Sequence, residues 1–282
     1  MRVIETIKEM RTFVSAARTA GKSIALVPTM GALHEGHLTL MRQAKAQCDI
    51  VIISIFVNPN QFGPQEDFSC YPRDLAGDSE KASHVGVDAI FHPTVAEMYP
   101  NGYSSYVVVE GITDKLCGLS RPGHFRGVTT VVNKLLNIVQ PDKAFFGQKD
   151  AQQILVLNRM VRDLNMNVQL EMVPIVREDD GLAMSSRNRY LSAQEHDAAV
   201  VLSQSLFLAQ RLVHAGERDV AKLRMAVVGL ITEQPLANLD YVEIYSYPEM
   251  ESISTLSTNV LLALAVRFGT TRLIDNIILE VN

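Results

Sequence analysis

Residues 23–57 read SIALVPTMGALHEGHLTLMRQAKAQCDIVIISIFV, and this stretch decides the fold. Its last nine residues, DIVIISIFV, are apolar on both faces of the expected strand instead of alternating, which is typical of a strand buried in a parallel sheet. The earlier apolar run, SIALV, leads into a glycine-bearing loop, and LTLMRQAKAQC, between the two runs, has the spacing of a helix. Strand, helix and strand in this order predict a parallel β-α-β unit.

The alternation of strands and helices continues on both sides of this stretch. A capping box formed by Thr6 and Glu9 predicts a helix that ends near Gly21. Further strands are expected at VDAIFHP, SYVVVEG, DKAFFG and NVQLEMVPIV, with helices at TTVVNKLLNIV and AQQILVLNRMVRDLN. We therefore expect residues 1–176 to form an α/β domain, a Rossmann-like doubly wound parallel sheet.

The pattern changes after residue 176. The segment REDDGLAMSSRNRYLS is polar and rich in turn residues, which marks a candidate domain boundary. Ser192 and Glu195 form a second capping box, which opens a helix running towards Gly216. A further helix near VAKLRMAVVGLITEQ precedes three expected strands, LDYVEIYSY, NVLLALAVRFG and TRLIDNIILEV. We expect residues 177–282 to form a smaller α+β domain.

The composition excludes several classes of protein. The 282 residues carry a formal net charge of −5, which argues against a nucleic-acid coat or a binder of anionic membranes. Cys48, Cys70 and Cys117 are odd in number and far apart, so neither a disulfide framework nor a structural zinc site is expected. The first ten residues mix acids and bases, unlike a signal peptide, and the apolar runs are shorter than the ~20 residues of a membrane span. We expect a cytoplasmic protein whose partners include neither nucleic acid nor a membrane.

The loop PTMGALHEGH, residues 28–37, lies where a parallel strand ends and a helix begins. Open parallel sheets bind ligands at this edge, and the N–H groups of a helix N-terminus attract phosphate. A metal pair at His34 and His37 would need a third ligand, and Glu35 points elsewhere at that spacing. Three interpretations stay open at this point: a phosphate site, a metal pair, or two surface histidines without a function. Contact with phosphate is favoured, because imidazole N–H groups can donate to phosphoryl oxygens.

The motif His34-Glu35-Gly36-His37 resembles the HxGH signature of the nucleotidylyltransferase superfamily. The longer strings PTMGALHEGH, FVNPNQF, YPRD, RPGHFRGV, FGQKDAQQ and DGLAMSSRNRYL closely resemble the pantothenate synthetase (pantoate–β-alanine ligase) family, in the family's order. The resemblance implies that ATP and pantoate form pantoyl adenylate and pyrophosphate, after which β-alanine gives pantothenate and AMP. Because the pantoate carboxylate is already ionised near neutral pH, the first step needs positioning and charge neutralisation, not a base.

The same resemblance implies a role for each matching residue. The catalytic set would be His34, His37, Lys149, Ser185, Ser186 and Arg187, with the last three on a mobile loop that closes over the triphosphate. The remaining ATP contacts would be Pro28, Thr29, Met30, Gly31, Gly147, Asp150, Val176 and Met184. Pantoate would contact Met30, Asn58, Gln61, Arg121 and Gln153. His124 could equally be a structural histidine of its loop.

The family also uses Mg²⁺, held by an acid shortly after YPR, and the matching residue here is Asp78. A Mg²⁺ ion held mostly by phosphates and water would need little help from the protein. The resemblance suggests a homodimer formed through the N-terminal domain, and no base for deprotonating β-alanine is identified. Two alternatives stay open: a nucleotidylyltransferase that acts on a different small acceptor, and a nucleotide-binding sensor without catalytic activity.

Overall fold

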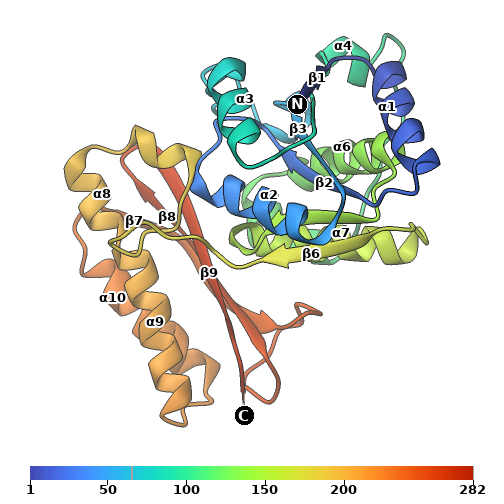
Figure 1. The fold of residues 1–282 in the computed structure, drawn as a ribbon. Helices are drawn as coiled ribbons and strands as arrows, with labels where there is room; N and C mark the ends of the chain where they lie inside the picture. The colour runs from blue at the N-terminus through green and yellow to red at the C-terminus, as the bar shows by residue number, and fades with distance from the viewer. Residues whose placement is uncertain (65, 282) are drawn as a thin grey trace. The chain divides into compact units, whose positions relative to one another are not determined.

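The computed structural model describes residues 1–64 and 66–281 (Figure 1). The chain divides into two compact units, Met1–Pro174 and Ile175–Asn282. Within the described ranges, no helix has the length and apolar character needed to cross a bilayer.

The first unit is built on a six-stranded sheet in which every strand pairing is parallel. The strand order is β1-β4-β3-β2-β5-β6, so the predicted doubly wound parallel sheet is confirmed. Its strands are β1 (Arg2–Ile4), β2 (Ile24–Thr29), β3 (Ile50–Ile55), β4 (Ala89–Phe91), β5 (Lys143–Gly147) and β6 (Gln169–Val173).

Helices cover both faces of this sheet (Figure 1). Buried residues of α2 and α3 pack on one face, against apolar side chains of the central strands. On the other face, α6 lies between α1 and α7 and contacts both. The helices are α1 (Ile7–Thr19), α2 (Glu35–Gln47), α3 (Leu75–His84), α4 (Val95–Met98), α5 (Cys117–Ser120), α6 (His124–Val139) and α7 (Ala151–Asp163). The 3-10 turns are η1 (Pro59–Gln61), η2 (Ile112–Asp114) and η3 (Gln148–Asp150).

The unbroken apolar runs form the centre of the sheet, as predicted. All residues of β2 except Pro28 are buried, and all of β3 except Ile50. The two strands pair in register from Ile24 with Ile50 to Thr29 with Ile55. A strand that is covered on both faces gains stability from apolar side chains at every position, which explains why no polar alternation is seen.

Two helix starts follow from local hydrogen bonds. Thr6 caps α1 by accepting the N–H of Glu9 at 3.2 Å, as the capping box predicts. The predicted helix at LTLMRQAKAQC begins three residues earlier than that string, at Glu35, with His34 as its N-cap. The HxGH motif therefore forms the first turn of α2.

Several sequence expectations differ from the structure, including the helix expected from Ser192 towards Gly216, which is divided at Val200 into Ala193–Ala199 and Val201–His214. The segment SYVVVEG was expected to be a strand, which is wrong: residues 105–111 are assigned to no strand. The Val107 N–H and C=O bond the hydroxyl groups of Thr130 and Thr129 on α6 instead of a neighbouring strand. The short strand β1 and the helix α3 were not predicted. Only Ile4 of β1 is buried, so that strand has no apolar run to reveal it.

The second unit is an α+β domain with a three-stranded antiparallel sheet of order β7-β8-β9. Helices α9 and α10 pack together and against this sheet around an apolar core. The predicted capping box is present, since Ser192 accepts the N–H of Glu195 at 3.3 Å. The elements are η4 (Ser186–Tyr190), α8 (Ala193–Ala199), α9 (Val201–His214), α10 (Val220–Thr232), β7 (Ala237–Ser246), β8 (Val260–Phe268) and β9 (Thr271–Leu279).

Candidate active site

The candidate site lies at the edge of the sheet where β2, β3 and β5 end. These strands are neighbours in the order β3-β2-β5, so the segments that follow them meet at one edge. From β2 the chain builds β3 and β4 on one side, then returns to place β5 on the other side of β2. A change of direction of this kind opens a crevice at the carboxyl ends of the strands, where α/β proteins bind ligands.

A tight turn leads from β2 into α2. Gly31 has φ +82° and Ala32 has φ +51°, a left-handed conformation that favours glycine. The hydroxyl of Thr29 accepts the Gly31 N–H at 3.2 Å and donates to the carbonyl of Ser54 at 2.6 Å. The turn is therefore tied to the ends of both central strands.

The histidines of the motif stand together at the start of α2. His34 is the N-cap, His37 is the third helical residue, and their ring centroids are 4.1 Å apart. The N–H of His34 donates to Nδ1 of His37 at 3.4 Å, which places the proton of a neutral His37 ring on Nε2. Burial, together with the charges of His34, Lys149 and Lys81, lowers the pKa of His37 well below its ordinary value. His37 is therefore a neutral hydrogen-bond donor near neutral pH.

Two residues of α3 hold the same turn. Both carboxylate oxygens of Asp78 accept backbone N–H groups, from Ala32 at 2.9 Å and from Leu33 at 2.8 Å. Nζ of Lys81 donates to the carbonyl of Leu33 at 2.8 Å. The family motifs give no role to Lys81. Its spacing of three residues from Asp78 places the two side chains on one face of a helix, and that spacing could have identified Lys81 as a second contact.

The residues predicted after β5 lie at the same edge as the histidines. Gly147 ends β5, Lys149 and Asp150 form the turn η3, and Gln153 is a half-buried residue in the first turn of α7. The positive charge of Lys149 contributes to the lowered pKa of His37. The structure therefore brings Lys149 and the histidine motif together, although more than a hundred residues separate them in the sequence.

The residues predicted after β3 form a network of amides. Asn58 is buried, and its Nδ2 donates to Oε1 of Gln61 at 3.0 Å and to the carbonyl of Gly127 at 3.1 Å. Its Oδ1 accepts the hydroxyl of Tyr99 at 2.9 Å. Nε2 of Gln61 contacts the sulfur of Met30 at 3.2 Å. Asn58 therefore orients Gln61, and Gln61 touches the loop that carries the histidines.

Arg121 lies in a network beside Gln61. Its guanidinium donates to both carboxylate oxygens of Glu66, at 2.6 and 2.7 Å. Burial acts to raise the pKa of Glu66, but its bonds from Arg121 lower it overall. Nδ1 of His124 donates to the carbonyl of Gln61 at 2.9 Å, and its Nε2 lies 3.0 Å from Arg121. In this structure His124 is thus a structural residue that fixes the Gln61 backbone, and Arg121 is paired with an acid.

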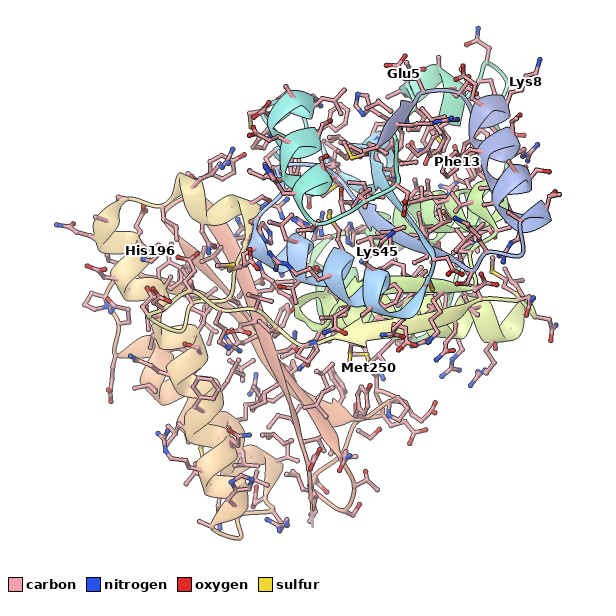
Figure 2. The ribbon with its side chains drawn as sticks, in the orientation of Figure 1. Glu5, Lys8, Phe13, Lys45, His196 and Met250 are labelled. Atoms are coloured by element: carbon pink, nitrogen blue, oxygen red, sulfur yellow. The ribbon has the colours of Figure 1, made fainter. Side chains whose placement is uncertain are left out.

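The remaining predicted residues belong to the second unit. The N–H of Met184 donates to the carbonyl of Val176 at 3.0 Å across a short hairpin. Ser185 caps η4 by accepting the N–H of Arg187 at 3.2 Å, and Ser186 is the first residue of that turn. Three polar contacts stabilise this segment: Arg177 with Asp275, Asn188 with Glu178, and Glu178 with His196. Figure 2 labels His196 on α8.

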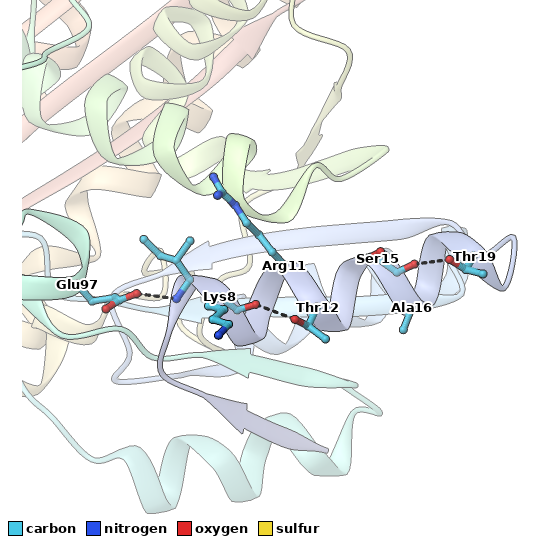
Figure 3. A pocket seen from close by; sticks show the side chains of 8 residues that line it. Lys8, Arg11, Thr12, Ser15, Ala16, Thr19 and Glu97 are labelled. Carbon is cyan, nitrogen blue, oxygen red and sulfur yellow. Dashed lines mark hydrogen bonds between the residues drawn. The ribbon is translucent and has the colours of Figure 1, made fainter.

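A surface hollow of about 990 Å³ lies along α1 (Figure 3). None of the predicted site residues lines it. The hydroxyls of Thr12 and Thr19 bond carbonyls of their own helix, and the N–H of Ile7 is taken by Glu97 at 2.8 Å. The hollow therefore contains none of the groups that the motifs single out, and the candidate active site is the sheet edge.

Comparison with known proteins finds relatives over nearly the whole chain. The family model described as pantoate-beta-alanine ligase matches residues 2–278. A pantothenate synthetase of Pelotomaculum thermopropionicum is 64% identical over 279 residues, 99% of each chain. The crystal structure of pantothenate synthetase from Thermus thermophilus is 43% identical, with a TM-score of 0.94, and covers 98% of this chain and 99% of its own. The pantoate-beta-alanine ligase of Francisella tularensis, complexed with beta-gamma ATP and beta-alanine, is 32% identical with a TM-score of 0.80, covering 99% and 97%.

Proposed function

The chain belongs to the pantoate–β-alanine ligase family, and we propose that its sheet-edge site joins pantoate to β-alanine with ATP, through a pantoyl-adenylate intermediate. The products are pantothenate, AMP and pyrophosphate. The observation that carries the proposal is the meeting of His37, which follows β2, with Lys149, which follows β5, at the switch point of the sheet. A neutral donor and a cation close enough for its charge to lower the donor's pKa suit a triphosphate.

In the first step a carboxylate oxygen of pantoate attacks the α-phosphorus of ATP. The bond from that phosphorus to the bridging oxygen of the β-phosphate breaks, and pyrophosphate leaves with the electron pair. No proton has to be removed, because the carboxylate is ionised near neutral pH. Negative charge develops on the phosphate oxygens, and Nε2–H of His37 and Nζ of Lys149 stabilise it as donors that are already in place.

Pantoate is proposed to bind between Gln61 and Gln153. The sulfur of Met30 is a weak hydrogen-bond acceptor, so Nε2 of Gln61 can exchange it for a substrate oxygen at little cost. Asn58 acts on pantoate through Gln61, because its own amide is already bonded to Gln61, Gly127 and Tyr99. Two neutral amides suit a small hydroxy acid better than a phosphate-bearing acceptor, so a different nucleotidyl transfer is not favoured.

In the second step the neutral amine of β-alanine attacks the acyl carbon of the adenylate. The carbon–oxygen bond to the phosphate breaks, AMP leaves with the electron pair, and the nitrogen of the amine gives up a proton to water as the amide forms. An ordinary alkyl ammonium group has a pKa near 10, so only a small fraction of β-alanine is reactive near neutral pH. We propose that the enzyme captures this neutral fraction without a dedicated base.

The residues near Asp78 do not form a protein cage for Mg²⁺. Both oxygens of Asp78 already accept backbone N–H groups, and its side chain is buried. In the part of the chain that the structure describes, no three His, Cys, Asp or Glu side chains group closely enough to hold a metal ion. The assignment of Mg²⁺ to Asp78 stays a prediction, and no step of the proposed reaction depends on it.

Three further proposals rest on the family resemblance. Ser185, Ser186 and Arg187 would contact the triphosphate, with Val176 and Met184 contacting the nucleoside. Arg121 would reach pantoate by exchanging its bond to Glu66. The protein would act as a cytoplasmic homodimer joined through its first unit.

The test is ATP–pyrophosphate isotope exchange with pantoate and without β-alanine. We expect label to enter ATP only when pantoate is present, which is the signature of a reversible adenylate. A protein that forms AMP with neither pantoate alone nor pantoate plus β-alanine would contradict the ligase activity. AMP formation that needs β-alanine, with no exchange beforehand, would contradict the adenylate route.

A further inference from the structure

We propose that Asp78 and Lys81, on one face of α3, are positioning residues that clamp the turn at residues 31–33 and so place His34 and His37 for the phosphates of ATP. The role of ATP rests on the proposed function, whereas the clamp itself rests on contacts within the protein. The clamp assigns to Asp78 a task other than binding Mg²⁺.

Both oxygens of the Asp78 carboxylate bond the turn. Its Oδ2 accepts the N–H of Ala32 at 2.9 Å, and its Oδ1 accepts the N–H of Leu33 at 2.8 Å. The residue is only 2% exposed, so water competes little for these oxygens. Hydrogen bonds to an ionised acceptor are about twice as strong as neutral ones, and here two of them hold consecutive peptides.

The turn needs such a partner because of its backbone conformation. Ala32 has φ +51°, which a residue with a Cβ rarely adopts without support from its surroundings. Gly31 has φ +82°, and a Cβ placed on it would stand 2.9 Å from Oδ2 of Asp78. Glycine therefore lets the carboxylate approach the turn, and the carboxylate then holds Ala32 in its strained conformation.

Lys81 completes the clamp from the next turn of α3. Its Nζ donates to the carbonyl of Leu33 at 2.8 Å, so α3 binds both the N–H and the C=O of the residue that precedes His34. The N–H of His34 in turn donates to Nδ1 of His37. The position of both rings therefore follows from where α3 holds Leu33.

The clamp also has an electrostatic consequence for the histidines. Lys81 is one of the cations whose charge lowers the pKa of His37, beside Lys149 and His34. The same side chain thus fixes the backbone of the motif and favours the neutral form of its second histidine. A Mg²⁺ ion at Asp78 would have to use the second lone pair of an oxygen that already accepts a backbone N–H.

The test compares Asp78→Asn with Asp74→Asn, two variants that each remove one negative charge from α3. Asp74 caps α3 by accepting the N–H of Gly77 at 3.0 Å, and asparagine caps a helix equally well. In Asp78→Asn the amide NH₂ faces one of the two N–H donors, so one contact to the turn is lost. We expect Asp78→Asn to lower kcat of pantoate-dependent exchange by about 10- to 100-fold. Asp74→Asn should stay within about twofold of wild type, because its cap remains.

Two readouts separate positioning from metal binding and from simple loss of fold. The Mg²⁺ concentration that gives half-maximal exchange should be the same in Asp78→Asn and wild type. Side-chain ¹⁵N signals of His34 and His37 should shift in the ligand-free Asp78→Asn protein and stay in place in Asp74→Asn. Recovery of Asp78→Asn at high Mg²⁺, or unmoved histidine signals, would overturn the proposal.

Lys81→Met gives a second, independent variant. The methionine keeps most of the apolar stem of this exposed lysine but cannot donate to Leu33. We expect kcat to fall several-fold and the thermal midpoint to stay close to wild type. Normal kcat in Lys81→Met overturns the clamp even if Asp78→Asn does not fold. If the wild-type protein shows no exchange, the proposed function is contradicted but the clamp is not. The histidine signals of the ligand-free variants then test the clamp by themselves.

Discussion

Gly127 of α6 lies against the peptide of Asn60 so closely that a Cβ on Gly127 would overlap the Asn60 carbonyl oxygen. The carbonyl of Gly127 accepts a hydrogen bond from the buried amide of Asn58. Helix α6 and the loop after β3 are therefore joined at a position that has room only for hydrogen.

Gly127→Ala should displace the loop that carries Gln61. Overpacking of a tight contact costs about 1–3 kcal/mol, so we expect a lower thermal midpoint together with a raised KM for pantoate. Gly229→Ala is the matched control, because Gly229 also lies within a helix and a Cβ there meets no atom within 4 Å. That variant should gain about 0.5–1 kcal/mol from helix propensity. Equal stability of the two variants would show that the loop moves to accommodate the new Cβ without a loss of stability.

Lys149→Ala should lower kcat by about 10²–10³ if its ammonium group stabilises charge in the transition state. The thermal midpoint should change little. Lys143→Ala serves as the control, since Lys143 lies on the same strand-and-turn segment and bonds Glu171 at 3.0 Å on a partly exposed surface. Near-normal turnover in Lys149→Ala would remove this residue from the site.

His37 should make the folded protein sensitive to mild acid. Its pKa in the folded state is lowered, with burial as the main cause, so the unfolded chain takes up a proton that the folded chain does not as pH falls below about 6.5. This contribution to stability is complete above pH 6.5 and is lost progressively towards the folded pKa.

The measurement is denaturant unfolding at pH 7.5 and pH 5.5 for wild type, His37→Gln and His84→Gln. The free energy of unfolding should fall less between pH 7.5 and pH 5.5 in His37→Gln than in wild type, by up to about 1.4 kcal/mol. This is the free energy that corresponds to one pH unit below the ordinary histidine pKa of about 6.5. His84 is exposed on α3, so His84→Gln should behave like wild type. An unchanged loss in His37→Gln would contradict the lowered pKa.

Gly31→Ala and Gly86→Ala should separate backbone strain from a close contact. The two glycines have nearly the same φ, +82° and +79°, so alanine is strained at both. Only at position 31 does the new Cβ meet Asp78, at 2.9 Å; at position 86 the nearest atom is a flexible lysine carbon 3.8 Å away. We expect the larger fall in thermal midpoint, and a loss of kcat, in Gly31→Ala alone. Similar stability and activity in both variants would argue against the contact.

Asp275→Asn tests the ion pair behind the hairpin of Val176 and Met184. The side chain of Asp275 is 1% exposed and lies 2.6 Å from Arg177, so breaking the pair leaves a poorly solvated cation. We expect a loss of about 3–5 kcal/mol in the stability of the second unit. Glu243→Gln breaks a pair whose remaining cation, Arg224, is about half exposed, and should cost about 0–1 kcal/mol. Denaturant unfolding measures both, and equal losses would contradict the difference in burial.

The central strands could be predicted because their signal is local. Runs such as those of β2 and β3 are apolar at nearly every position, which fits a strand with both faces covered. The segment at residues 105–111 carries a similar β-branched signal. There the hydroxyls of Thr129 and Thr130 bond the Val107 backbone, so tertiary contacts override the strand propensity.

The identities of the site residues could be proposed from motifs, but their supporting contacts could not. The bond between Asp78 and Leu33 spans 45 positions, and the bond between Asn58 and Gly127 spans 69. No local pattern marks either pair, because both depend on how α3 and α6 pack on the sheet. The motifs therefore indicated which groups could meet ATP and left unspecified what holds them.

The order of the strands also has a consequence for how the protein matures. Strand β5 joins the edge of β2 late in the chain, and the N–H of Ile24 bonds Asp142, 118 positions away. Closing so long a loop is slow and entropically costly, and it must precede any meeting of His37 with Lys149. A growing polypeptide that already contains the histidines therefore lacks the cation that follows β5 until synthesis has passed Lys149. An incomplete chain released before that point would present the histidine motif without Lys149.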